Sequence, residues 1–135
     1  LFGCTEGKLP YRSLRFEWVH EDIDNFQDAP VVAYPQAENF TRITEYKKLP
    51  VQKVNGTTYA VEYSQPYELG TKAEPYYPVL TEKSQRLYKK YRRRADLISN
   101  LYHCGRLADF KYYNMDQALE RALAVCTNIE RSLTR

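Results

Sequence analysis

The chain has 135 residues, of which 43% are hydrophobic and 27% charged, and its formal net charge is +3. These values lie close to ordinary globular usage, which argues against wholesale disorder and against a collagen-like chain. No apolar run is long enough to span about 30 Å of hydrocarbon, so we expect a single domain over residues 1–135 with no membrane span.

Alternation of apolar and polar residues predicts strands in the first half of the chain. The first candidate covers Leu14–His20, and shorter ones follow at Pro30–Tyr34 and Thr41–Lys47. Asn55-Gly56 is a strong turn signal, and the alternating run Thr57–Tyr63 follows it directly. The runs on the two sides of this turn are compatible with an antiparallel pair.

The period of the apolar residues becomes helical after residue 80. Thr81 can cap a helix over about 81–99, whose inward face would carry Leu87, Tyr91, Ala95 and Ile98. Leu101–Cys104 then reads as a short buried strand that ends at Gly105.

A last helix is expected over about 114–133. Asn114 can cap it, with Gln117 at the capping-box position. Its apolar stripe consists of Leu119, Ala122, Cys126, Ile129 and Leu133. Strands at about 10–80 followed by two C-terminal helices predict an α+β fold with a mostly antiparallel sheet.

Charge, histidine and cysteine patterns exclude several classes of site. The basic run Lys89–Arg94 falls on the outer face of its helix, which favours a solvated face over phosphate or nucleic-acid binding. His20 and His103 lack metal-ligand spacing, so no metal site is expected. The three cysteines favour free thiols, although one disulfide remains arithmetically possible. Thirteen tyrosines suit a wet, ligand-lined surface better than a dry core.

Three segments carry features of a binding site. Pro10–Glu17 places two arginines three residues apart on one strand, so one of them faces inward or a cleft unless the sheet is two-sided. Glu74–Val79 holds two tyrosines between prolines, which keeps the segment extended. Gly105–Asp116 brings Gly-Arg and a polar aromatic run to a helix start, where free N–H groups, Arg and Tyr suit a diphosphate.

Five motifs, in this order, resemble the UDP-galactopyranose mutase family. They are PYRSLRFE (10–17), TRITEYK (41–47), EY (62–63), EPYYPV (74–79) and GRLADFKYYNMD (105–116). The resemblance covers nearly the whole chain, but the N-terminal FAD-binding region of the family, with its glycine-rich loop, has no counterpart in it. The chain therefore resembles the C-terminal portion of such a protein.

The resemblance implies a part of a cytoplasmic, flavin-dependent isomerase. In the family, reduced FAD attacks the anomeric carbon of UDP-galactopyranose and expels UDP. The sugar then recloses as the furanose without net redox change, for surface polysaccharides such as lipopolysaccharide. The implied partners are a UDP-sugar and the missing FAD domain. The isolated chain is expected to bind no FAD, to be inactive, and to self-associate.

Residue roles follow from the same resemblance. The substrate-binding residues would be Arg42, Glu62, Tyr77 and Tyr112, with Glu62 in the cleft wall and the other three on the diphosphate. The catalytic residues would be Arg12, Arg106 and Asn114, and the last two would also contact the flavin. Tyr76 and Tyr113 are expected to pack instead.

The sequence departs from the family pattern around its last motif. Asn114 stands where the family has Asp, and Ala108-Asp109-Phe110 replaces Gly-Glu-Tyr. These departures leave open a paralogue that acts on another nucleotide sugar. A non-catalytic module that binds a nucleotide sugar or a protein is the other alternative.

Overall fold

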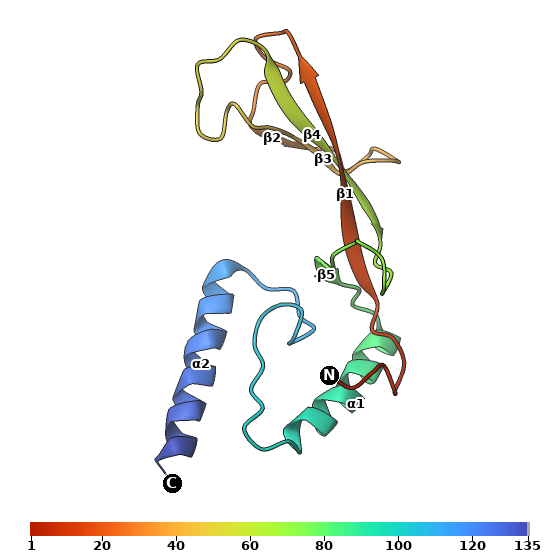
Figure 1. The fold of residues 1–135 in the computed structure, drawn as a ribbon, viewed down its shortest axis with the longest axis vertical. Helices are drawn as coiled ribbons and strands as arrows, with labels where there is room; N and C mark the ends of the chain where they lie inside the picture. Colours follow the sequence, from red (N-terminus) through yellow and green to blue (C-terminus); the bar gives the residue numbers. More distant parts are fainter. Residues whose placement is uncertain (135) are drawn as a thin grey trace. The chain divides into compact units, whose positions relative to one another are not determined.

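A computed structural model describes residues 1–134 of the chain as two compact units. The first unit contains residues 1–12, 67–70 and the described residues from Pro75 onward, and the second contains residues 13–66 and 71–74. The described residues form five strands and two helices, labelled in Figure 1. In chain order these are β1 (Tyr11–Glu21), β2 (Val31–Ala33), β3 (Arg42–Glu45), β4 (Thr57–Pro66), β5 (Tyr77–Pro78), α1 (Glu82–Asp96) and α2 (Met115–Leu133).

The strands form one antiparallel sheet in the order β2-β3-β4-β1-β5. All four runs predicted as strands by alternation are present, and the two runs on either side of Asn55-Gly56 do pair antiparallel as β3 and β4. The predicted α+β fold is therefore confirmed. The turn requires its glycine, because Gly56 has a φ of 71° and an added Cβ would lie 3.0 Å from the carbonyl oxygen of Glu21.

The core of the second unit combines apolar and polar side chains on one face of the sheet. Ile43 and Tyr59 are buried, and the ring of Phe26 stacks on Tyr59 at a centroid distance of 3.9 Å. Glu45 and Thr57 are also fully buried, and the Thr57 hydroxyl donates to Glu45 Oε1 at 2.7 Å. A carboxylate is stable at this depth because it receives several hydrogen bonds there.

Both helices begin at the predicted residues. Thr81 has extended backbone before α1, and its side chain accepts from the Ser84 amide at 3.1 Å. Asn114 precedes α2, and its amide donates to Gln117 Oε1 at 3.0 Å, the capping-box arrangement expected from the sequence.

The packed face of α1 matches the prediction except at its end. Tyr91 and Ala95 are buried and Leu87 is half-buried. The Tyr91 hydroxyl donates to the carbonyl oxygen of Gly7 at 2.7 Å, which fixes the N-terminal segment against the helix. The helix ends at Asp96, so Ile98 lies beyond it and is exposed.

The packed face of α2 differs from the predicted stripe. Val125 is its buried residue, while the stripe residues Leu119, Cys126 and Leu133 are exposed. Ala122 and Ile129 are half-buried, so the contact face is rotated away from the most apolar side of the helix. A row of large apolar side chains on α2 consequently faces solvent in this chain.

The prediction of a short buried strand at Leu101–Cys104 is wrong. This segment belongs to the irregular connection between α1 and α2 in Figure 1, with Tyr102 and Cys104 exposed. A strand needs a hydrogen-bonding neighbour, and no strand among the described residues pairs with this segment. The three cysteines are free and exposed, and neither described helix is long and apolar enough to cross a membrane.

Candidate functional site

The first unit brings together three of the predicted site residues. Arg12 in β1 is the register partner of Tyr77 in β5, and the Arg12 carbonyl oxygen accepts from the Tyr76 amide at 2.9 Å. The ring of Tyr77 lies 5.8 Å from that of Tyr112, measured between centroids. Tyr77 is half-buried and Tyr112 is 60% exposed, so this tyrosine pair lies at the surface.

The loop that carries Tyr112 is held by half-buried ionic contacts and by a buried aromatic contact. Arg121 of α2 forms two hydrogen bonds to Asp109, from Nε at 3.0 Å and from a terminal nitrogen at 3.1 Å. The Tyr113 hydroxyl donates to the same carboxylate at 2.9 Å. Phe110, at a φ of 48°, is buried against the ring of Tyr11. The loop is thus fixed on both sides of Tyr112.

The pKa values around Asp109 reflect this arrangement. Burial alone raises the pKa of Asp109, but hydrogen bonds from Arg121 and Tyr113 outweigh it and leave the pKa below its ordinary value. Burial and the same carboxylate raise the pKa of Tyr113. Both groups therefore keep their usual charge near neutral pH, and Tyr113 acts in packing, as expected.

Arg106 and Asn114 border the same loop. Arg106 is half-buried, and its carbonyl oxygen accepts from the Lys111 amide at 3.0 Å. Asn114 is exposed at the start of α2, where the free N–H groups of the helix and its macrodipole favour an anionic group. Both residues thus lie next to the loop that carries Tyr112.

Arg42 and Glu62 form an ion pair in the second unit. Arg42 Nε donates to Glu62 Oε1 at 2.9 Å across the β3–β4 register, and the Thr41 hydroxyl donates to the same oxygen at 2.7 Å. The Glu62 side chain is 9% exposed, whereas that of Arg42 is 42% exposed. The buried carboxylate holds an arginine that stays accessible to an anion.

The two arginines of the first motif both lie at the surface. Arg15 has a half-exposed side chain whose guanidinium carbon stands 3.9 Å from the ring centroid of Tyr63, and Arg12 is exposed as well. In the part of the chain that the structure describes, no three His, Cys, Asp or Glu side chains are grouped as metal ligands would be.

The first unit also contains a cavity of about 630 Å³. Tyr11, Tyr67, Tyr88 and Leu101 are among its mostly apolar lining, with Arg92 and His103 as charged or polar members. None of the seven predicted site residues lines it. The cavity and the proposed site are therefore different features of the unit.

Sequence reasoning missed the Asp109–Arg121 pair. Some indication of each residue was present in the sequence, since Asp109 lies within a site motif and Arg121 occurs beside the apolar positions of α2. Nothing local in the sequence, however, matches a carboxylate to a guanidinium twelve residues away.

Comparisons with known proteins agree with the order of the motifs. The family model for UDP-galactopyranose mutase matches residues 1–112. The chain belongs to the UDP-galactopyranose mutase family. It is 37% identical over 123 residues to a UDP-galactopyranose mutase of Mycoplasma genitalium and 36% identical over 128 residues to one of Mycoplasma pneumoniae.

A third relative has a different name. A dTDP-fucopyranose mutase of Escherichia coli is 31% identical over 119 residues. The three matches cover 88%, 92% and 87% of this chain but only 30%, 32% and 31% of the relatives. The chain thus spans about a third of the length of the mutases that it matches.

Proposed function

We propose that this chain is the C-terminal, substrate-cleft portion of a nucleotide-sugar mutase that interconverts UDP-galactopyranose and UDP-galactofuranose in the cytoplasm for surface-polysaccharide synthesis. The observation that carries the proposal is the placement of Tyr77 beside Tyr112, from motifs far apart in the sequence. Because Arg12 is the register partner of Tyr77, the Arg12 guanidinium and the hydroxyls of Tyr77 and Tyr112 belong to adjoining positions of one unit. This donor set suits a diphosphate.

Part of a flavin site is also supported. The described chain offers Arg106 after Gly105 and the start of α2, which suit the edge of a phosphate-bearing cofactor. No G-x-G-x-x-G loop is present in these 135 residues. We therefore propose that Arg106 and Asn114 contribute only one edge of an FAD site, and that the rest of the whole protein supplies the pyrophosphate loop. When bound and reduced, the flavin supplies the nucleophile for the anomeric carbon.

The chain's own residues would stabilise the departing UDP. Negative charge grows on the diphosphate as the bond from the anomeric carbon to its oxygen breaks. Tyr77 and Tyr112 donate hydroxyl hydrogen bonds to it. The family resemblance adds the guanidinium of Arg42, which Glu62 orients within the second unit. Arg12 binds near the sugar. Fixed donors of this kind need little reorganisation when charge develops, which lowers the barrier.

The test replaces single hydroxyls in the full-length protein loaded with reduced flavin. Tyr77→Phe and Tyr112→Phe should each lower kcat/KM for UDP-galactopyranose by about 10- to 100-fold, the cost of a hydrogen bond to a charged group. Tyr76→Phe is the matched control, because it has the same chemistry, neighbours Tyr77 and is expected to leave the rate unchanged. Equal losses in all three variants would contradict the assignment.

A second candidate, a mutase for another nucleotide sugar, is supported by the likeness to the dTDP-fucopyranose mutase and by Asn114. Asn114→Asp tests it, because Asp restores the family's charge while both side chains are good helix caps, so stability should change by less than about 1 kcal/mol. Turnover with UDP-galactopyranose should rise in the variant if that is the substrate. Turnover with UDP-galactopyranose should not rise if the protein acts on another nucleotide sugar, and a variant that unfolds would contradict the capping argument.

The isolated chain should neither bind FAD tightly nor catalyse the reaction, because most backbone donors to the cofactor would be missing. An absorbance spectrum of the purified 135-residue chain after incubation with FAD measures this directly. A stoichiometric flavin band would overturn the expectation and would favour a complete site within the chain.

A further inference from the structure

The positive charge of this chain is concentrated on one helix. Seven of the 15 residues of α1 are Lys or Arg and two are acidic, so the helix carries a net charge of +5, whereas the whole chain carries +3. The other residues together are therefore slightly acidic. The seven cations are Lys83, Arg86, Lys89, Lys90, Arg92, Arg93 and Arg94.

Ion pairs neutralise only part of this charge. Glu82 pairs with Arg86 and Asp96 with Arg92, while Glu6 lies 3.8 Å from Lys90 and 3.4 Å from Arg94. Lys83, Lys89 and Arg93 are exposed and form no ion pair with another described residue. After the carboxylates of Glu82, Asp96 and Glu6 are subtracted from the seven cations, α1 and its partners keep a net charge of about +4.

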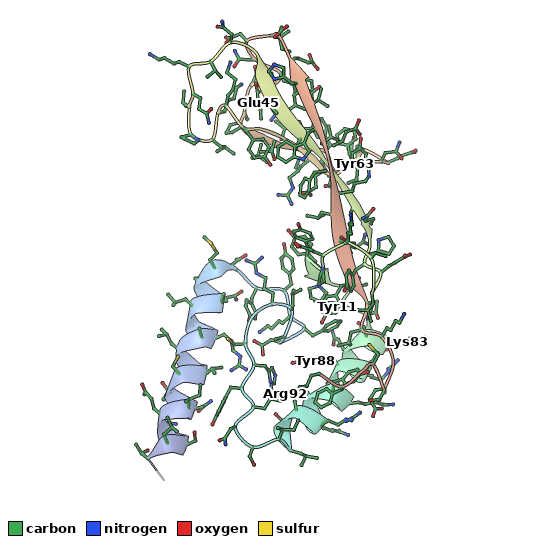
Figure 2. All side chains as sticks on the ribbon, in the orientation of Figure 1. Tyr11, Glu45, Tyr63, Lys83, Tyr88 and Arg92 are labelled. Atoms are coloured by element: carbon green, nitrogen blue, oxygen red, sulfur yellow. The ribbon has the colours of Figure 1, made fainter. Side chains whose placement is uncertain are left out.

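The cations form a straight row on the side of α1 that faces away from the packed residues. Lys83, Arg86, Lys90 and Arg93 follow one another at helical spacings of three and four, opposite the buried Tyr91 and Ala95. Figure 2 shows Lys83 on the other side of α1 from Tyr88 and Arg92. The helix is about 22 Å long, so it presents this charge as an extended, nearly linear surface.

An exposed leucine continues the same row. Leu97, four residues after Arg93, caps α1 with helical backbone and is 85% exposed. Ile98 beside it is 42% exposed. A phosphate backbone offers an apolar side chain nothing to contact, whereas the boundary between lipid headgroups and acyl chains accommodates one together with the neighbouring cations.

We propose that the outer face of α1 docks on an anionic lipid bilayer, with the cation row on the phospholipid headgroups and Leu97 inserted between them. Charge complementarity supplies the attraction, since clustered Lys and Arg on a helix bind acidic headgroups with additive strength. The apolar face of α1 stays packed within its unit. The sequence alone favoured a solvated face, and Lys83 and Arg93, which form no ion pair with another described residue and lie in line with an exposed leucine, alter that interpretation.

The test measures sedimentation of the protein with vesicles of phosphatidylcholine alone or of two parts phosphatidylcholine to one part phosphatidylglycerol. Binding should require phosphatidylglycerol and weaken with salt. The triple variant Lys83→Gln, Lys89→Gln, Arg93→Gln should lose about 100-fold in partitioning. The matched triple Lys53→Gln, Lys72→Gln, Arg131→Gln, with the same change in net charge, should lose much less.

A second pair of variants separates lipid from nucleic acid. Leu97→Ser should weaken vesicle binding by about tenfold, and the equally exposed Val51→Ser should not. Circular dichroism checks that every variant is folded. The proposal would be overturned if the protein showed no preference for anionic vesicles, or if both triple variants lost vesicle binding equally. It would also be overturned if the protein bound DNA more tightly than vesicles and Leu97→Ser had no effect.

Discussion

Glu45 shows how one buried charge organises the second unit. Its side chain is completely buried, and its two oxygens accept from the amides of Phe26 and Gln27 at 3.0 and 3.2 Å. Lys48 Nζ lies 3.4 Å from the second oxygen. A single carboxylate thus fastens the loop before β2 to the end of β3; Glu45 is labelled in Figure 2.

The pKa of Glu45 makes this contribution dependent on pH. Burial alone raises the pKa, but the hydrogen bonds from Thr57, Phe26 and Gln27 and the contact with Lys48 outweigh it and lower the pKa from 4.5 to about 2. A carboxylate whose pKa is lowered by folding stabilises the fold above its unfolded pKa. That stability is lost as the pH falls from about 4.5 towards 2.

Glu45→Gln should therefore lower the free energy of unfolding by on the order of 2 kcal/mol at neutral pH. The difference from the parent should shrink as the pH falls towards 2, because both side chains are then neutral. Urea unfolding at several pH values measures it, with the exposed Glu68→Gln as control. A constant difference at all pH values would mean that the charge is not what matters.

Local sequence patterns identified Glu45 only as one position of a strand. Alternation in Arg42–Glu45 correctly puts Ile43 and Glu45 on one face, but it cannot show that the buried face accepts a carboxylate. The tyrosines illustrate the same limit. Tyr59, Tyr91 and Tyr113 are core residues whose hydroxyls find partners, against the interpretation that the tyrosine bias marks a wet surface.

Among the elements, α2 shows what periodicity captures and what it misses. Its start at Asn114 follows from capping chemistry and is local, so the sequence predicts it. Its packed face depends on which neighbouring segment is present. Val125 and Arg121 therefore face the unit, while the larger apolar residues Leu119 and Leu123 are exposed. Leu101–Cys104 has the composition of a strand but lacks a neighbouring strand within the described residues.

Arg121→Met should separate the role of the ion pair from that of helix packing. Loss of two hydrogen bonds to Asp109 should lower the free energy of unfolding by about 2 kcal/mol. The Asp109 carboxylate would then keep the hydrogen bond from the Tyr113 hydroxyl. Arg131→Met on the same helix is exposed and serves as control. Hydrogen exchange should show faster exchange in residues 105–113 of the Arg121 variant, and equal effects of both variants would contradict this role.

At the scale of the whole molecule, the apolar side of α2 is an exposed apolar surface. Met115, Leu119 and Leu123 are 82%, 63% and 59% exposed and lie at successive intervals of four residues. Large exposed apolar patches mark surfaces that are covered in the functional protein. We expect further chain of a longer mutase-family protein to cover this side, since the chain spans about a third of the length of its relatives.

The isolated chain should consequently self-associate through α2. Light scattering at increasing concentration should show species larger than a monomer, because the exposed leucines find one another when no other surface covers them. The double variant Leu119→Gln, Leu123→Gln should shift the chain towards monomer, whereas Val51→Gln and Val54→Gln in the second unit should not. A strictly monomeric parent at high concentration would count against this expectation.

The exposed cysteines turn this surface into a chemical reporter. Cys126 lies on α2 beside its exposed apolar residues. Cys104 lies in the irregular segment before Gly105, which pairs with no described strand, and its side chain is exposed as well. Thiol alkylation followed by mass spectrometry would modify both in the isolated chain at concentrations low enough to keep it monomeric. If the rest of the full-length protein covers these two places, both thiols become slow to react there. Their reaction rates, compared with that of Cys4, would map the contact without any substitution.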